Sequence, residues 1–235
     1  MAKRFTCVSF GVLCLVATAP VGASPRIAVD AGATAAPNAA SLAFSFNNVP
    51  EGELPDGWTV DATNPRGPLA SWTIVSDPHA PNPPHVLSLT GVKDTSRGVF
   101  NLCWKPGAEF RDGEIQVTLR ANGGEVDQGG GPIWRARDRN NYYIARWNPL
   151  EDNFRLYYVK EGRRVELASE DVQLPREEWH TITVRHLGNS IVCFLDGEEL
   201  LKAEDTTFPE AGGVGLWTKA DAATSFDDFT TRRQD

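Results

Sequence analysis

The stretch from Gly129 to Val159 constrains the fold more than any other part of the chain. Apolar and polar residues alternate along it, which is the pattern of strands with one buried face. Turn-forming Asp, Asn and Pro residues interrupt the alternation twice. The pattern predicts three strands, at 133–137, 142–147 and 154–159, with connections at 138–141 and 148–153. We therefore expect an antiparallel meander with one core face.

The predicted register sorts the side chains of this meander into two faces. A four-residue turn at 138–141 places Arg137 opposite Tyr142 and Arg135 opposite Ile144, and the next connection places Trp147 opposite Phe154. Because side chains alternate across a strand, one face is apolar and is the expected core face. Its members are Trp134, Ala136, Tyr143, Ala145, Trp147, Phe154, Leu156 and Tyr158. The other face holds four arginines and no acid; its members are Arg135, Arg137, Tyr142, Ile144, Arg146, Arg155 and Tyr157.

The rest of the chain repeats the strand signal. Further short strands are expected at 42–46, 71–76, 86–89, 98–104, 113–120, 164–168, 181–186, 191–195, 198–203, 213–218 and 225–230. The segment 47–68 is dense in turn signals and is expected to be irregular. No stretch keeps a helical period. The number and spacing of the strands predict an all-β fold, a two-sheet antiparallel jelly-roll sandwich.

The amino-terminal sequence predicts export. Residues 1–23 have the pattern of a secretory signal, with Lys3 and Arg4 before an apolar run at 5–16 and small residues at 21–23. The apolar run is too short for a membrane span. Residues 24–41 are rich in Ala with scattered Pro and Gly, and are expected to form a disordered tether. We therefore expect a secreted or periplasmic protein whose folded domain covers residues 42–235.

Charge and cysteine content narrow the classes further. The formal net charge is −8, and loss of the signal removes two of 23 basic and none of 31 acidic residues, so the remainder carries 21 − 31 = −10. A chain this acidic is not a general binder of nucleic acid or anionic membranes. Cys103 and Cys193 remain after the signal; a disulfide and two buried thiols are equal alternatives. The absence of a CxxC motif argues against a structural zinc site.

The order of motifs after Gly113 resembles a known superfamily. It includes GGGPIWRARD, Asn-Tyr-Tyr, WHTITVRH, IVCFLDG, GVGLWTK and SFDDF. This order is similar to the concanavalin A-like lectin/glucanase superfamily, and closest to its 3-keto-disaccharide hydrolase (DUF1080) and laminin-G-like domains of secreted bacterial proteins. The resemblance implies a concanavalin A-like sandwich. It does not select an activity, since this fold carries lectins, glycosidases, lyases and spacers.

The chain departs from the laminarinase-type glycosidases of that fold. Those enzymes carry a Glu-x-Asp-x-x-Glu strand motif, whereas the strand from Glu114 to Arg120 holds one acid. A retaining mechanism needs two carboxyl groups facing each other across the substrate. The sequence offers no second one, so a laminarinase activity is not expected.

The arginine-bearing face of the meander is the leading candidate site. Arginine forks suit carboxylates and vicinal hydroxyls, and tyrosine rings suit the C–H surfaces of sugars. The predicted glycan-binding residues are Arg135, Arg137, Tyr142, Arg146, Arg155 and Tyr157, with the two tyrosines as stacking platforms. The alternative is a solvated outer face whose arginines pair with Glu114 or Glu166.

The sequence offers two further candidate sites, one for a metal ion and one for catalysis. Asp227 and Asp228 are candidate ligands of a structural calcium ion, completed by oxygen atoms of Asn47, Asn48 or Glu51; exposed acids at a strand end are the alternative. The even spacing of His180 and His186 places them on an apolar face, which favours packing. In the Pro-rich loop, His79 or His85 would be a general base with Asp77.

These features predict a secreted carbohydrate-binding β-sandwich. One alternative is a hydrolase of (3-keto-)glycosides similar to the 3-keto-disaccharide hydrolases. A second is a laminin-G-like protein-interaction spacer.

Overall fold

The computed structural model describes residues 41–92 and 95–234. The predicted signal and tether fall outside these residues, apart from position 41. The described residues form fifteen strands and no helix. The strands are β1 (Leu42–Phe44), β2 (Thr59–Thr63), β3 (Ser71–Ser76), β4 (His85–Gly91), β5 (Phe100–Phe110), β6 (Gly113–Gly123), β7 (Gly131–Asp138), β8 (Asn141–Asn148), β9 (Asn153–Lys160), β10 (Arg163–Asp171), β11 (His180–Leu187), β12 (Ser190–Leu195), β13 (Glu198–Glu204), β14 (Gly212–Lys219) and β15 (Ala223–Arg233).

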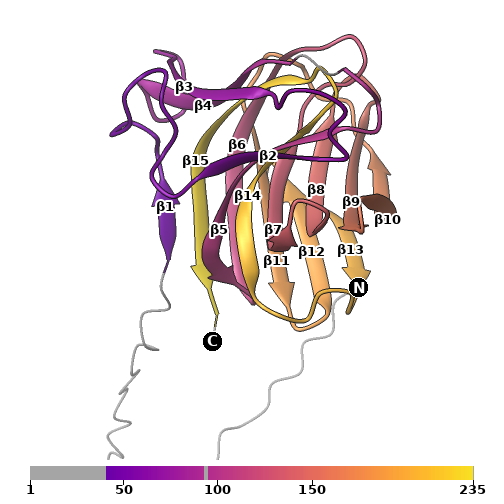
Figure 1. The fold of residues 1–235 in the computed structure, drawn as a ribbon. Coiled ribbons are helices and arrows are strands. Elements are labelled where there is room, and N and C mark those ends of the chain that lie inside the picture. The colour runs from indigo at the N-terminus through magenta and orange to yellow at the C-terminus, as the bar shows by residue number, and fades with distance from the viewer. Residues whose placement is uncertain (1–40, 93–94, 235) are drawn as a thin grey trace, which may run out of the picture. The chain divides into compact units, whose positions relative to one another are not determined.

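The strands form two antiparallel sheets that pack face to face (Figure 1). The eight-stranded sheet has the order β13-β12-β11-β6-β15-β4-β3, with β1 paired to β15. The seven-stranded sheet has the order β10-β9-β8-β7-β14-β5-β2. This arrangement confirms the predicted all-β, two-sheet antiparallel sandwich.

The main core lies between the two sheets and includes the predicted core face of the meander except Ala136, which follows the bulge in β7 and lies in the apolar cluster on the opposite face of the sheet. Trp134, Tyr143, Trp147, Phe154 and Leu156 all belong to it and have no exposed surface. The β8–β9 register is the predicted one, with Trp147 paired to Phe154. Each such side chain contributes about 1.5–3 kcal/mol when fully buried, which fixes which face of the meander points inward.

The β7–β8 register differs from the prediction. Two residues close the turn, Arg139 and Asn140, with Asp138 paired to Asn141, whereas a four-residue turn was expected. Ile133 then pairs with Ile144, and a bulge follows Trp134. Arg135 lies in this bulge with a φ of 45°. A bulge re-aims the side chains that follow it, so the predicted pairing of Arg135 with Ile144 is wrong.

One strand was missed in the sequence. β2 lies within the segment expected to be irregular, and it pairs with β5 along its whole length. The Pro55-Asp56-Gly57 turn precedes it and Asn64-Pro65 follows it, so the turn signals were correctly read but the short strand between them was not. Its closing residues Ala62 and Thr63 are buried.

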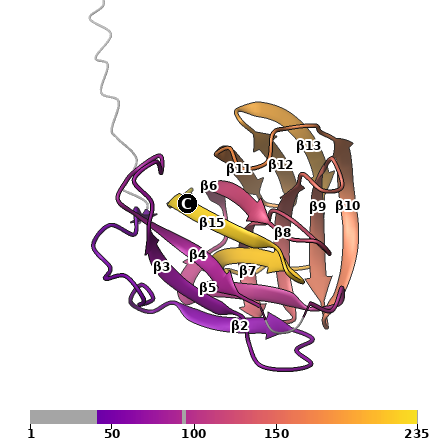
Figure 2. The same ribbon diagram turned by 90° about the horizontal axis from the view of Figure 1, so that it is seen from above.

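The seven-stranded sheet curves away from its partner, so that its edge strands β2 and β10 turn toward each other (Figure 2). A second apolar cluster fills the concave face: Phe100, Leu102, Trp104, Ile133, Ala136, Tyr142, Ile144, Tyr157, Val159 and Trp217. The side-chain amide of Asn64 donates to the carbonyl of Gly162 at 2.8 Å, joining the end of β2 to the β9–β10 turn. Arg164 of β10 lies over Phe100, 5.3 Å from its ring centroid. The middle of the concave face is therefore closed.

Candidate functional site at the end of the concave face

The structure separates the six residues predicted to bind a glycan. Arg146 of β8 and Arg155 of β9 stay together on the concave face, with Tyr157 beside them. Tyr142 occupies the same face but is part of the closed apolar cluster. Arg135 in the bulge of β7 and Arg137 after it contact other parts of the molecule. The predicted face is thus a smaller site than expected.

Arg135 is a structural tie. It is 1% exposed, and its guanidinium donates to the carbonyls of Arg111, Phe208 and Gly188 at 2.8–2.9 Å. It also donates to Asp112 at 3.1 Å. Arg137 is exposed and lies over the ring of Phe208, 5.2 Å from its centroid. The prediction that these two arginines share a surface with Arg146 is wrong, because the bulge redirects both.

The two tyrosines offer no ring face to a ligand. Tyr142 has no exposed surface; its hydroxyl lies 2.8 Å from that of Thr63 and accepts from the indole N–H of Trp217 at 3.1 Å. Tyr157 is 3% exposed and lies under the guanidinium of Arg164 at 4.3 Å. The predicted role of both as stacking platforms is therefore wrong for the described structure.

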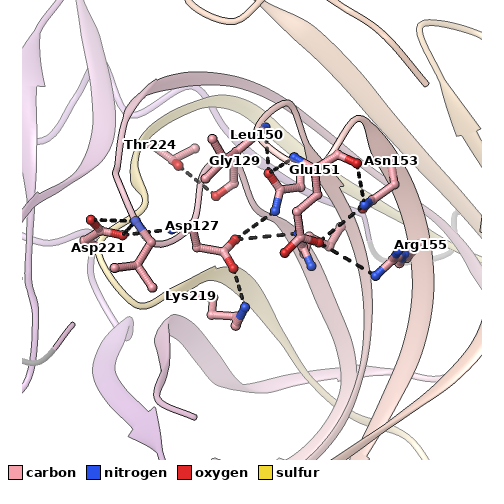
Figure 3. Close-up of polar contacts among 12 residues, drawn as sticks. Asp127, Gly129, Leu150, Glu151, Asn153, Arg155, Lys219, Asp221 and Thr224 are labelled. Atoms are coloured by element: carbon pink, nitrogen blue, oxygen red, sulfur yellow. Dashed lines mark hydrogen bonds and ion pairs between the residues drawn. The ribbon is translucent and has the colours of Figure 1, made fainter. Parts of the chain in front are cut away.

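The residues that remain at the end of the concave face form a charged group, here called the Arg146 cluster (Figure 3). It consists of Asp127, Arg146, Glu151, Arg155 and Lys219. Arg146 Nη2 donates to Glu151 Oε2 at 2.9 Å and lies 3.6 Å from Asp127 Oδ1. Lys219 Nζ donates to Asp127 Oδ2. Asp127 and Arg146 have almost no exposed surface, so these charges interact in a medium of low polarity.

Asp221 places Asp127 in the cluster. It lies in the β14–β15 turn, and its carboxylate accepts from the backbone N–H groups of Glu125, Val126 and Asp127 at 2.7–3.0 Å. Figure 3 shows Asp221 beside this loop. Although burial raises the pKa of Asp221, these N–H donors outweigh that effect and hold it below its ordinary value. The glycine-rich β6–β7 loop is thus held in one conformation by an acid from another part of the chain.

An Asn turn places Glu151. The side-chain oxygen of Asn148 accepts from the N–H groups of Leu150 and Glu151 at 2.9 and 3.2 Å. The side-chain amide of Asn148 donates to Asp127 at 3.1 Å, which joins the two acid-bearing loops. Burial raises the pKa of Glu151, but Arg146 and Asn153 outweigh it, so the pKa lies below its ordinary value. Glu151 is therefore a carboxylate at neutral pH.

Arg155 agrees in part with the alternative prediction, in which the arginines of this face are solvated and pair with Glu114 or Glu166. It lies 3.6 Å from Glu166 and 3.7 Å from Glu151. The side chains of Glu151 and Arg155 are 39% and 31% exposed, so they form the solvent-facing side of the cluster. The seven strand positions of this face hold no acid, but Asp127 and Glu151 reach it from loops outside the strands. In the sequence, the one sign of this contact was that Asp127 and Glu151 lie in connections next to the strands of the meander.

Several buried polar atoms of this face have no hydrogen-bond partner. They are Arg146 Nε, Arg146 Nη1, Asn153 Oδ1 and Arg164 Nη1. A buried polar atom left unpaired costs about 1–3 kcal/mol, and more when it is charged. Arg146 itself is fully buried. The site therefore holds donors that a hydroxyl or an anionic oxygen would satisfy.

The predicted calcium ligands lie in a hydrogen-bond network. Asp227 accepts from the backbone N–H groups of Asn82 and Asp228 at 2.8 and 2.7 Å, and Asp228 accepts from the Asn82 side chain at 3.0 Å. Asn47 also donates to Asn82, so the first and last strands meet here as expected. Burial raises the pKa of Asp227 to about 6. Within 41–92 and 95–234, no group of three His, Cys, Asp or Glu residues is suited to a metal ion, and the calcium site stays a prediction.

The two histidines of β11 pack in the core, as the spacing predicted. His186 Nδ1 accepts from the indole N–H of Trp134 at 2.8 Å. Both ring nitrogens of His180 are engaged, by Asp196 at 2.7 Å and the carbonyl of Pro175 at 2.9 Å. No nitrogen of His180 is left to act as a base.

In the Pro-rich loop, Asp77 is engaged by groups other than imidazole. Its Oδ2 lies 2.7 Å from Arg120 and its Oδ1 accepts from the backbone N–H of His79. His85 lies 3.8 Å from Glu51. The structure therefore does not bring Asp77 and an imidazole together as a catalytic pair.

Cys103 and Cys193 are both buried free thiols, so the predicted alternative of a disulfide is not found. They lie on strands of different sheets, β5 and β12. In the part of the chain that the structure describes, no helix has the length and apolar character to cross a membrane.

No protein-family model and no curated protein matches the chain. Solved structures do match. A carbohydrate-binding module, CBM66, from Bacillus subtilis is 18% identical, with 74% of this chain and 95% of that chain covered, at a TM-score of 0.57. A B. subtilis protein of unknown function with a galectin-like fold is 14% identical, with coverage of 75% and 90% and a TM-score of 0.53. Domain 4 of AbnA, a GH43 extracellular arabinanase from Geobacillus stearothermophilus in complex with arabinotriose, is 9% identical, with coverage of 75% and 82% and a TM-score of 0.51. At these identities the likeness establishes the fold alone, a galectin-like jelly-roll sandwich.

Proposed function

We propose that the chain is a glycan-binding domain and that the Arg146 cluster is its binding site. The observation that carries the proposal is the fully buried Arg146, whose Nε and Nη1 have no partner while its neighbours Glu151 and Arg155 face solvent. Arginine donors and carboxylate acceptors side by side match the paired hydroxyl groups of a sugar. Support also comes from the fold, which this chain shares with a carbohydrate-binding module and with an arabinanase domain in complex with arabinotriose.

The closed concave face limits how a glycan is held. The apolar cluster and Arg164 occupy the middle of the sheet, and the polar groups lie at one end of it. A long chain therefore has no open groove to follow across the strands. We expect the site to hold a short part of a glycan, such as its end.

Binding fits the cluster better than hydrolysis does. Asp127 and Glu151 both approach Arg146, which makes them the closest counterpart of a catalytic acid pair at this site. A general acid needs a raised pKa, whereas Arg146 and Asn153 hold the pKa of Glu151 low. Asp127 is 1% exposed and bound by Lys219 and Asn148, so it does not face a substrate. The two alternative functions, a glycoside hydrolase and a protein-interaction spacer, are distinguished from glycan binding by the test below.

The test is a glycan array probed with the full chain and with variants of the solvent-facing residues. Glu151→Gln and Arg155→Gln are expected to weaken retention about ten- to hundredfold, since a hydrogen bond to a charged group contributes about 1.5–3 kcal/mol. Glu170→Gln, on an exposed position of β10, is the matched control and should bind like the parent. Absence of any glycan binding by the parent chain would refute the proposal, and reducing-sugar release would favour the hydrolase.

The amino-terminal pattern adds a proposal about location. Residues 1–23 read as a secretory signal, which would deliver the domain to the periplasm or the medium, where polysaccharides are found. Mass spectrometry of the protein from the culture medium or periplasm should show an amino terminus close to Ser24. An intact Met1 in an exported fraction would contradict this.

A further inference from the structure

Two arginines of the concave face carry unpartnered buried nitrogen atoms. Arg146 of β8 is fully buried, and its Nε and Nη1 have no hydrogen-bond partner. Arg164 of β10 has a buried Nη1 that also has none. The strand between them, β9, contributes Tyr157, whose ring lies 4.3 Å from the Arg164 guanidinium. The unpaired groups therefore lie on β8 and β10, with β9 between them.

The two guanidinium groups lie close enough to influence each other. Burial lowers the pKa of Arg164, and the charge on Arg146 lowers it further, although Tyr157 acts in the opposite direction. Neighbouring like charges in a poorly hydrated place are unfavourable unless an opposite charge lies between them. Glu151 meets only Nη2 of Arg146, which leaves the other two nitrogens of that group unpaired.

The Arg146 cluster, taken together with Glu166 and with Arg164 from the middle of the face, carries a net positive charge. Four cations, Arg146, Arg155, Arg164 and Lys219, face three acids, Asp127, Glu151 and Glu166. The surplus is one positive charge on a chain whose net charge is −8. Three of the four unpartnered atoms are donors, and only Asn153 Oδ1 is an acceptor. The unmet requirement is for acceptor oxygens that carry negative charge.

We infer that the site takes an acidic sugar and binds its carboxylate or sulfate group between Arg146 and Arg164. This inference rests on the proposed glycan-binding function and names the class of glycan. Guanidinium groups bind such planar or tetrahedral anions through paired N–H donors. The Glu151 carboxylate already makes such a bond with Nη2 of Arg146.

The test compares acidic oligosaccharides with their neutral derivatives on the full chain by isothermal titration calorimetry. The probes are oligogalacturonides and hyaluronan fragments, the same compounds after reduction of each carboxyl to a primary alcohol, and a sulfated carrageenan oligosaccharide. We expect at least one acidic probe to bind, and carboxyl reduction to weaken a uronate probe about tenfold or more. Preference for the sulfated probe identifies sulfate as the group that is bound.

Variants locate the anion. Arg164→Gln should lose the preference for the acidic probe while the protein remains folded by circular dichroism, because Arg164 is only partly buried. Arg163→Gln, the exposed neighbour on the same strand, is the matched control and should keep it. Equal binding of acidic and neutral probes overturns the inference but leaves the glycan-binding function standing. Failure to bind any glycan refutes both, and an unchanged preference in Arg164→Gln refutes the location.

Discussion

Loss of the Asp127 carboxylate, which pairs with Lys219 and Arg146, is expected to destabilise the fold. Asp127 is 1% exposed, and removal of its charge leaves two cations of 10% and 0% side-chain exposure without their shared counter-ion. Breaking a buried ion pair by loss of one partner costs about 3–5 kcal/mol. For a domain of this size, such a loss lowers the melting temperature by about 6–20 °C. Asp127→Asn is the suitable change, since it keeps the shape and one acceptor oxygen.

The assay is urea unfolding of four proteins: the parent, Asp127→Asn, Lys219→Met, and the double variant. We expect each single change to be costly and the double variant to be more stable than the sum of the two losses predicts, by about 0.5–3 kcal/mol. The control Glu170→Gln should stay within about 0.5 kcal/mol of the parent. Additive losses, or a loss of under about 1 kcal/mol for Asp127→Asn, would refute the view that these charges hold the site together.

Two further predictions concern buried groups elsewhere in the core. Burial and the nearby Arg135 lower the pKa of His186 from 6.5 to about 3. As the pH falls, His186 is therefore protonated in the unfolded chain before it is protonated in the folded one. The stability that neutral His186 contributes is complete above pH 6.5 and is lost as the pH falls toward 3. The free energy of unfolding changes by at most about 1.4 kcal/mol per pH unit in this range, and the change should be smaller in His186→Gln. Urea titrations at several pH values measure it, and the same pH dependence in the parent and the variant would contradict the prediction. Burial also raises the pKa values of the Cys103 and Cys193 thiols, so iodoacetamide should leave both unmodified in the native protein and label both after unfolding; a disulfide-linked peptide in the mass spectrum would contradict the structure.

Local alternation was sufficient to predict most of the sandwich. The pairing of Trp147 with Phe154 was correct because the connection between β8 and β9 has a strong turn signal and the large apolar residues all fall on one parity. The same reasoning placed His180 and His186 in the core. A one-residue shift would expose the whole apolar set, so these assignments had little freedom.

Two predictions were wrong because they depend on contacts that local sequence patterns do not encode. Arg135 in the bulge donates to the carbonyls of Arg111, Phe208 and Gly188, which come from distant connections. The strand β2 depends on its partner β5 more than on its own composition. In both cases contacts far apart in the sequence outweigh the local preference.

The sequence by itself determined the all-β class, most of the strand positions and the side of the meander that is buried, because alternation and turn chemistry act between near neighbours. The tertiary structure alone decided what the arginine-bearing side became. Curvature of the seven-stranded sheet brought Arg164 over Phe100 and closed the middle of the face. The hydrogen bond from the backbone N–H of Asp127 to Asp221 holds the β6–β7 loop where the Asp127 carboxylate lies beside Arg146. Curvature and loop placement are sums of many long-range contacts, so the acids and the closed aromatic surface became visible only in the folded chain.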